Sequence, residues 1–109
     1  MPRIDAEMFR LHAEICKTLS HPRRLEILSI LRHGEMAVGA IVNLMRASKA
    51  NVSQHLAIMR KSGILVARRD GQSVHYRISD PKVTRACDLM REVLITNQTQ
   101  KNRILTKET

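Results

Sequence analysis

Polar side chains suited to reading DNA bases gather at the start of one predicted helix, in the stretch SKANVSQHLAIMRKSGIL from Ser48 to Leu65. Asparagine and glutamine can each form two hydrogen bonds to adenine, and lysine can donate to guanine or to a phosphate. An exposed helix start with these side chains has the donors and acceptors that a major groove requires. Taken alone, the stretch is equally consistent with a surface helix that is polar at one end. The candidate residues are Ser48, Lys49, Asn51, Ser53, Gln54 and His55.

The sequence predicts different roles for two of these candidates, Gln54 and His55. Gln54 is the strongest candidate for reading a base, because its amide offers both a donor and an acceptor. His55 has two interpretations: it either approaches the groove or makes a structural contact to the third helix.

A second group of polar and basic residues surrounds the dipeptide Asp70-Gly71, which is typical of β-hairpin turns. Such side chains are suited to phosphates and to the minor groove, contacts that set affinity more than sequence choice. The alternative is a solvated turn that binds nothing. The candidate residues are Arg68, Arg69, Gln72, Ser73 and Arg77.

Two cysteines and one histidine form a third group, with a candidate regulatory role. His12 lies four residues before Cys16, on the same face of a predicted helix, and Cys87 lies near the other end of the chain. Together they could hold a soft metal or trivalent arsenic, or the thiols could form a disulfide or a persulfide. Cysteines are more often small buried hydrophobic residues, and that alternative stays open.

The composition favours a polyanionic partner. The chain has 109 residues, a length typical of one domain, and 43% of them are hydrophobic, which is enough for a core. A net charge of +9 and a pI near 10.6 favour phosphate-rich partners. Aromatic residues make up only 2%, which argues against stacking platforms for single strands. We therefore expect double-stranded DNA as the partner.

Other classes of protein lack their sequence signals here. No apolar run approaches the ~18 residues of a membrane span, and the first residues do not form a secretory signal. The protein is therefore expected in the cytoplasm, with reduced thiols and no membrane partner. There is no Gly-rich phosphate loop, no HExxH and no GxSxG, so neither an enzyme nor a small-molecule substrate is expected.

The elements that must position these residues follow from hydrophobic spacing. Behind the polar start of the candidate reading helix, Val52, Leu56 and Met59 form an apolar stripe, with Ile58 beside it. Ser48 is suited to cap that helix, because its hydroxyl can accept from an unpaired backbone N–H.

The whole pattern predicts a mainly α fold of about five helices with a small β-hairpin. The predicted helices cover residues 5–19, 22–33, 35–45, 48–63 and 80–97, and the predicted strands cover 64–66 and 74–78, around a turn at 68–73. Two short helices joined by a turn at 46–48 form a helix-turn-helix, and a hairpin directly after it is a wing. One domain over residues 1–96 is followed by a polar tail, 97–109, expected to be frayed or disordered.

Four blocks of residues resemble the ArsR family of small winged-helix repressors. They are LSHPRRLEIL at 19–28, NVSQHL at 51–56, KSGIL at 61–65 and RDGQSVHYRI at 69–78, and the resemblance covers about residues 13–95. It implies a homodimer joined through the first and last helices, whose apolar seams lack an obvious partner within one subunit. Such a dimer would present two reading helices to an inverted-repeat operator.

The metal and thiol sites known in that family do not match this sequence. Residues 35–41 lack a Cys-x-Val-Cys motif, and Lys82 stands where a site on the last helix would need a histidine. Ser29 replaces the second-helix cysteine of the persulfide sensors. No cofactor is therefore expected.

Three alternatives to a sequence-specific repressor stay open. One is an architectural protein that coats DNA without preference, and another is a protein-interaction module on the same scaffold. The variety of polar side chains at residues 48–55 favours base reading, and the basic wing argues against the interaction module. The third is a repressor that responds to a metal or metalloid through Cys16, Cys87 and His12.

Overall fold

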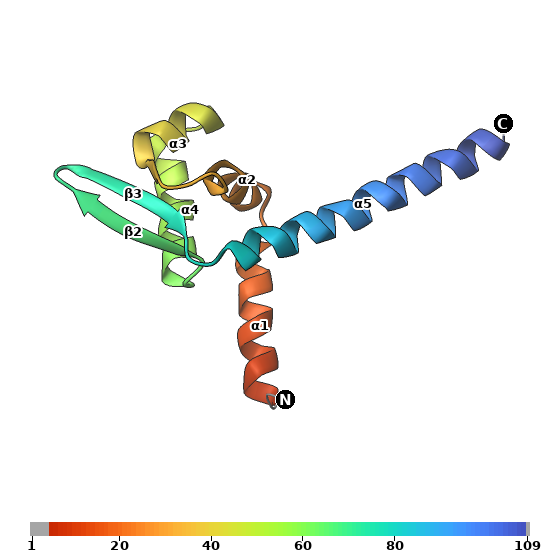
Figure 1. The fold of residues 1–109 in the computed structure, drawn as a ribbon, viewed down its shortest axis with the longest axis horizontal. Coiled ribbons are helices and arrows are strands. Elements are labelled where there is room, and N and C mark those ends of the chain that lie inside the picture. The colour runs from red at the N-terminus through yellow and green to blue at the C-terminus, as the bar shows by residue number, and fades with distance from the viewer. Residues whose placement is uncertain (1–4, 109) are drawn as a thin grey trace.

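Residues 5–108, which the structure describes, form five helices and a three-stranded antiparallel sheet, which confirms the predicted winged helix-turn-helix (Figure 1). The structure, a computed structural model, describes residues 5–108 and the side chains of residues 5–101. The elements are α1 (Ala6–Leu19), α2 (Pro22–Leu31), β1 (Met36–Ala37), α3 (Val38–Met45), α4 (Lys49–Lys61), β2 (Leu65–Asp70), β3 (Ser73–Ile78) and α5 (Pro81–Glu108).

Four helices begin at residues whose side chains accept from the first turn, and at α5 the Asp80 carboxylate accepts from the Lys82 N–H at 2.9 Å. The Asp5 carboxylate accepts from the Met8 N–H at 3.1 Å at the start of α1. The Ser48 hydroxyl accepts from the Asn51 N–H at 3.1 Å, which confirms the predicted cap of α4. His21 caps α2 through its Nδ1, with Pro22 at the first helical position, where a missing N–H costs nothing.

The core lies where α2, α3 and α4 meet the sheet. The predicted stripe of α4 is buried, whereas Ile58 beside it is 38% exposed. From α1 and α5 only half-buried side chains reach this core. The fully buried residues are Ile27, Leu28, Leu31, Ile41, Met45, Val52, Leu56, Met59, Ile64 and Leu65.

The turn between α3 and α4 occupies residues 46–48, as predicted. Arg46 has a φ of 52°, in the left-handed region that residues with a Cβ rarely adopt. Its N–H donates to the Val42 carbonyl at 3.0 Å and so closes the end of α3. This geometry directs the chain from the third helix into the candidate reading helix.

The wing is longer than predicted, because β2 and β3 extend almost to the tip. The order of strands is β1-β3-β2, and Asp70 pairs with Ser73 across a loop of only Gly71 and Gln72. Gly71 has a φ of 63° at the first loop position, as a type II′ turn requires. The predicted turn over residues 68–73 was therefore too wide.

A short edge strand, β1, replaces the predicted first turn of the third helix. Met36 and Ala37 pair with Tyr76 and His75 of β3, so the helix begins at Val38 instead of Glu35. Two residues are too few to show the alternation that indicates a strand. The pairing depends on a segment distant in sequence, which local pattern does not reveal.

Helix ends also differ from the prediction. The second helix ends at Leu31, and Gly34 has a φ of 135° in the loop that follows. The reading helix ends at Lys61, before Gly63 at φ 85°. The last helix runs past the predicted end near Asn97 to Glu108, since no glycine or proline follows Pro81 to interrupt it. That residues 97–109 fray stays a prediction, and Thr109 and residues 1–4 lie outside the described residues.

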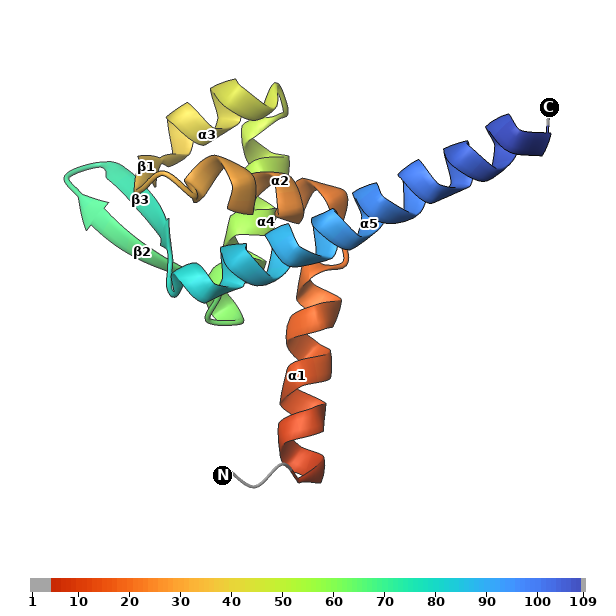
Figure 2. The same cartoon turned by 45° about the vertical axis from the view of Figure 1, so that its right-hand side comes forward.

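Two helices project from the body, which we call the arms, α1 and α5, while α2, α3, α4 and the sheet form the head (Figures 1 and 2). The radius of gyration is 17.3 Å, whereas a compact domain of this size has about 13 Å. An ion pair between Arg32 and Asp88, at 2.6 Å, ties α5 to α2.

Candidate nucleic-acid interface

Helix α4 turns its apolar side inward and its polar start outward. Val52, Leu56 and Met59 are fully buried, whereas Lys49 and Gln54 are exposed. Asn51 and Ser48 are also exposed and Ser53 is half-buried. The front predicted to approach DNA is therefore accessible over the first two turns of the helix.

His55 does not belong to that front. Its side chain is only 8% exposed, and its Nδ1 accepts from the Arg24 Nε at 3.3 Å. The ring of His21 lies 4.5 Å away, centre to centre. Burial lowers the pKa of His55, and the charges of His21, Arg24 and Arg23 lower it further. This burial favours the structural interpretation of His55, and its contact is with α2 instead of the expected third helix.

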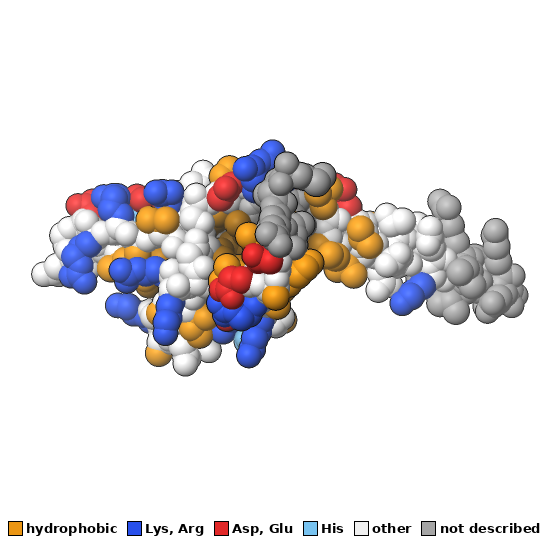
Figure 3. Space-filling model, turned by 90° about the horizontal axis from the view of Figure 1, so that it is seen from below, with side chains coloured by type: hydrophobic (Ala, Val, Ile, Leu, Met, Phe, Trp, Pro, Cys, Tyr) orange, Lys and Arg blue, Asp and Glu red, His pale blue; other side chains and the backbone are white. Residues whose placement is uncertain are grey.

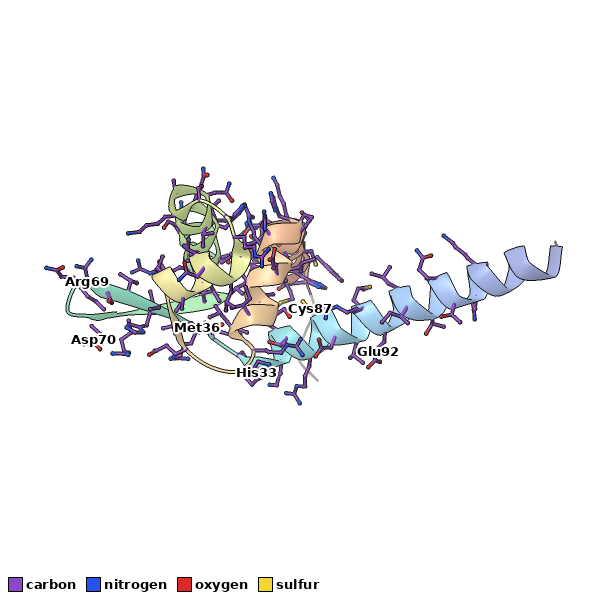
Figure 4. All side chains as sticks on the ribbon, turned by 90° about the horizontal axis from the view of Figure 1, so that it is seen from above. His33, Met36, Arg69, Asp70, Cys87 and Glu92 are labelled. Carbon is purple, nitrogen blue, oxygen red and sulfur yellow. The ribbon has the colours of Figure 1, made fainter. Side chains whose placement is uncertain are left out.

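The arginines of the wing lie on two different faces of the hairpin. Side chains alternate along a strand, and Arg69 pairs with Val74 on the face that carries Tyr76 and the core. Arg68 and Arg77 lie on the opposite face. Figure 4 shows Arg69 at the end of the wing. The predicted wing residues thus do not form one basic patch.

Arg68 is held by a carboxylate of the head. Its Nη2 donates to Glu35 Oε1 at 2.6 Å and its Nε lies 3.2 Å from both carboxylate oxygens. Because of this hydrogen bond, the pKa of Glu35 is lowered and that of Arg68 is raised. His75 lies 3.9 Å from the same carboxylate. Arg68 therefore links the wing to the loop before β1 through an ion pair with Glu35.

Two open hollows flank the start of α4. One, of about 470 Å³, lies towards the wing and brings together Lys49, Ser53, Gln72 and Ser73. The other, of about 610 Å³, lies towards α2. It is lined on the α4 side by Ser48, Asn51, Gln54 and His55, and on the α2 side by His21, Arg23 and Arg24.

The side chains of α2 in this second hollow were missed by the prediction from sequence. A signal was present, because Arg23 and Arg24 occupy the first turn of a helix with no acidic residue there. Cations are disfavoured at the positive end of a helix dipole, so a pair of arginines there requires a reason. Figure 3 shows blue Lys and Arg side chains gathered over the head, while orange hydrophobic side chains follow the start of α5.

The predicted regulatory residues are not brought together within one chain. Cys16 is exposed on α1, and Cys87 is half-buried on α5, close to the head in Figure 4. Among residues 5–101, no three His, Cys, Asp or Glu side chains are grouped to hold a metal, so His12, Cys16 and Cys87 make no such site in a single subunit. Burial raises the pKa of the Cys87 thiol, and Asp88 adds to that effect.

Known proteins resemble this chain in sequence and in fold. A family model for bacterial regulatory proteins of the arsR family matches residues 21–66. The HTH-type transcriptional regulator Rv0081 of Mycobacterium tuberculosis is 35% identical over 80% of this chain and 77% of its own. Its crystal structure superposes with a TM-score of 0.78 at 32% identity, over 89% of this chain and 98% of that one.

Two further similar proteins are a transcriptional activator and a homodimeric DNA-binding domain. The transcriptional activator HlyU of Vibrio cholerae is 32% identical over 72% of this chain and 73% of its own. The homodimeric winged helix-turn-helix DNA-binding domain of Mb0332 from Mycobacterium bovis has a TM-score of 0.74 at 32% identity, over 86% of this chain and 90% of that one.

Within the described residues no helix has the length and apolar character needed to cross a bilayer. The sequence motifs, the winged helix-turn-helix fold and the relatives all indicate one family. The chain belongs to the ArsR family of transcriptional regulators and is not an enzyme.

Proposed function

We propose that two copies of this chain bind one inverted-repeat operator in double-stranded DNA and repress the adjacent promoter in the cytoplasm. The observation that carries this proposal is the exposed polar start of α4 between two open hollows, on a protein of net charge +9. A helix start of this kind fits a major groove, and the surrounding charge supplies affinity.

Three residues are proposed to read bases or fix the register of the helix. Asn51 and Gln54 are exposed amides three residues apart, so they lie on neighbouring positions of one helix face. Each can pair with an adenine through two hydrogen bonds. Lys49, at the first helical position, is proposed to donate to a guanine or to a phosphate.

The arms are proposed to join the two copies. Apolar side chains on both arms are open to solvent, with Phe9, Leu89 and Met90 each 62% exposed. Several large apolar side chains exposed along one helix favour an interaction surface there. The homodimeric state of the Mb0332 domain supports the same arrangement here.

Repression is the simplest consequence of such binding, because a bound dimer excludes other proteins from the DNA that it covers. Activation would require an additional contact with the transcription machinery, and the name of HlyU shows that a relative is regarded as an activator. A promoter carrying the selected operator, fused to a reporter gene, distinguishes the two signs. Reporter output should fall when the protein is expressed.

Selection of bound duplexes from a random pool tests DNA recognition, and light scattering tests the oligomeric state. We expect an enriched inverted repeat and a particle of twice the 12.5 kDa chain mass. Equal affinity for selected and random duplexes would instead support an architectural role. Absence of any duplex affinity would support a protein-interaction module.

A thiol switch is a second proposal, and the exposures favour Cys16 over Cys87 as its first target. Cys16 is exposed, whereas Cys87 is half-buried with a raised pKa and therefore holds less of the reactive thiolate. Mild oxidation should weaken operator binding by the native protein and not by Cys16→Ser. If oxidants, metals and arsenite leave operator binding unchanged for both the native protein and Cys16→Ser, any thiol or metalloid switch is contradicted.

A further inference from the structure

The hollow between α2 and α4 contains cations where a helix disfavours them. Arg23 and Arg24 are the second and third residues of α2, directly after Pro22 and the capping His21. No acidic residue lies in that first turn. The N-terminus of a helix is itself electropositive. A bound anion would therefore be attracted both by the two guanidinium groups and by the helix dipole.

The hydrogen bonds of the two arginines fix them without using all their donors. Arg24 donates through Nη1 to the Thr18 carbonyl at 2.9 Å and through Nε to His55 at 3.3 Å. Arg23 donates through Nη1 to Glu26, in an ion pair at 3.1 Å, and to the Met45 carbonyl at 3.4 Å, whereas Arg68 uses both its Nε and its Nη2 on Glu35. Among the side chains that the structure describes, none accepts from Nη2 of either arginine. Each guanidinium is thus fixed in position and still has N–H groups that can donate to a ligand.

The other wall of the hollow is the start of the candidate reading helix. Ser48, Asn51 and Gln54 line that wall. Within the described part of the chain, no carboxylate lines the hollow. An anion bound here would therefore lie directly beside the side chains that are proposed to read bases.

We propose that this hollow binds one backbone phosphate of the DNA strand that borders the major groove on the α2 side of α4. A helix inserted in the major groove has a phosphate strand along each flank, and contacts to those phosphates fix its register. Arg23 supplies the phosphate contact, with His21 beside it, and Arg24 orients His55 and the wall of the hollow. This inference rests on the DNA binding proposed above and adds residues of α2 to the interface.

Arg23→Gln is the informative variant, and Arg85→Gln on α5 is its control. Both remove one charge, but Arg85 lies outside the hollow. We expect Arg23→Gln to bind operator and random duplex about tenfold more weakly, and the salt slope of binding to fall by about one for each subunit bound. Arg85→Gln should leave both close to native. An unchanged affinity and salt slope for Arg23→Gln would overturn the proposal.

Arg23 also bonds to Glu26 and Met45, so its loss could loosen the fold. Replacing single phosphates of the DNA by an uncharged analogue distinguishes that effect from loss of a direct contact. Methylphosphonate is placed at each position of the operator in turn. With the native protein, one position flanking the bases read by α4 should weaken binding. With Arg23→Gln, that position alone should lose its effect while the other sensitive positions keep theirs. A variant that loses affinity but keeps the full native set of sensitive positions would show that Arg23 acts only on the fold.

Failure of this inference and failure of the proposed function give different results. If no duplex is preferred in the selection, the proposed function fails and no operator exists for the scan. If an operator is found and Gln54→Ala reduces its preference while Arg23→Gln changes nothing, the phosphate site alone is wrong.

Discussion

The head and the arms of this molecule differ in the burial of their apolar side chains. The head buries ten apolar residues from three helices and the sheet in one cluster. No residue of α1, all of which is described, is fully buried, and α5 leaves Leu89, Met90 and Val93 more than half exposed. Burial of apolar area is the main favourable term in folding, so most of this stabilisation within one chain comes from the head. The arms lack that stabilisation until another surface covers them.

The largest effect should come from a cavity in the head. Leu56 is fully buried in α4, and we expect Leu56→Ala to lower the free energy of unfolding by about 2–5 kcal/mol. Leu44 of the same head is 60% exposed, and Leu44→Ala should change it by less than about 0.5 kcal/mol. Urea unfolding curves measure both. Similar losses for the two variants would mean that the core of the head is not where the structure places it.

A charge on an arm should separate the subunits and leave the head folded. We expect Met90→Glu to raise the dimer dissociation constant roughly 100-fold, because a charge would be buried without a partner in the paired arms. Leu44→Glu serves as the control, since Leu44 is about as exposed as Met90 but belongs to the head. Analytical ultracentrifugation gives the constants. A stable Met90→Glu dimer would mean that α5 is not part of the interface.

Within the head, base reading and general affinity should be separable. Gln54→Ala should reduce the preference for operator over random duplex by roughly tenfold, since a two-point contact to a base is worth about 1–3 kcal/mol. Affinity for random duplex should change little. Competition binding with both duplexes measures the ratio, and equal losses on the two would remove Gln54 as a reader.

Two of the three arginines of the wing, Arg69 and Arg68, provide a matched pair. Arg69→Ala should weaken binding to all duplexes and lower the salt slope by about one for each subunit bound. Arg68→Ala should have a smaller effect, because Glu35 already offsets the charge of Arg68. Binding isotherms at several salt concentrations measure both slopes. A larger effect for Arg68 than for Arg69 would mean that the ion pair with Glu35 breaks when DNA binds.

The smallest effect expected is on the pH dependence of stability. Burial lowers the pKa of His55, so the unfolded state binds a proton more readily than the folded state. The stability from neutral His55 is complete above the ordinary pKa of about 6.5 and is lost as the pH falls towards the folded-state value. His55→Gln should flatten the fall in melting temperature between pH 7.5 and 5. His12→Gln, on the exposed face of α1, should leave it unchanged.

Much of the head follows from local sequence signals. The stripe Val52, Leu56 and Met59 has helical spacing, and Ser48 is a cap whose bond to the Asn51 N–H needs no distant residue. The polar start of α4 then faces outward because the stripe faces inward. The exposed apolar seams of the arms could also be predicted, since hydrophobic spacing does not depend on the partner that covers it.

The features that the sequence does not reveal share a different cause, which is dependence on residues far away in sequence. His55 turns inward because Arg24 and His21 of another helix meet it, and Arg68 is held by Glu35, which lies 33 positions earlier. β1 exists only because β3 returns beside it. No periodicity or propensity within a short window carries these contacts.

Arg24 has one more consequence for the molecule. Its guanidinium bonds both to the Thr18 carbonyl near the end of α1 and to His55 in α4. Subunit pairing through α1 and attachment of α4 to DNA are thereby expected to be linked equilibria, in which each changes the other by the same factor. A duplex with a single half-site, too short to bridge two subunits, should then shift the monomer–dimer balance. Arg24→Gln should abolish the shift.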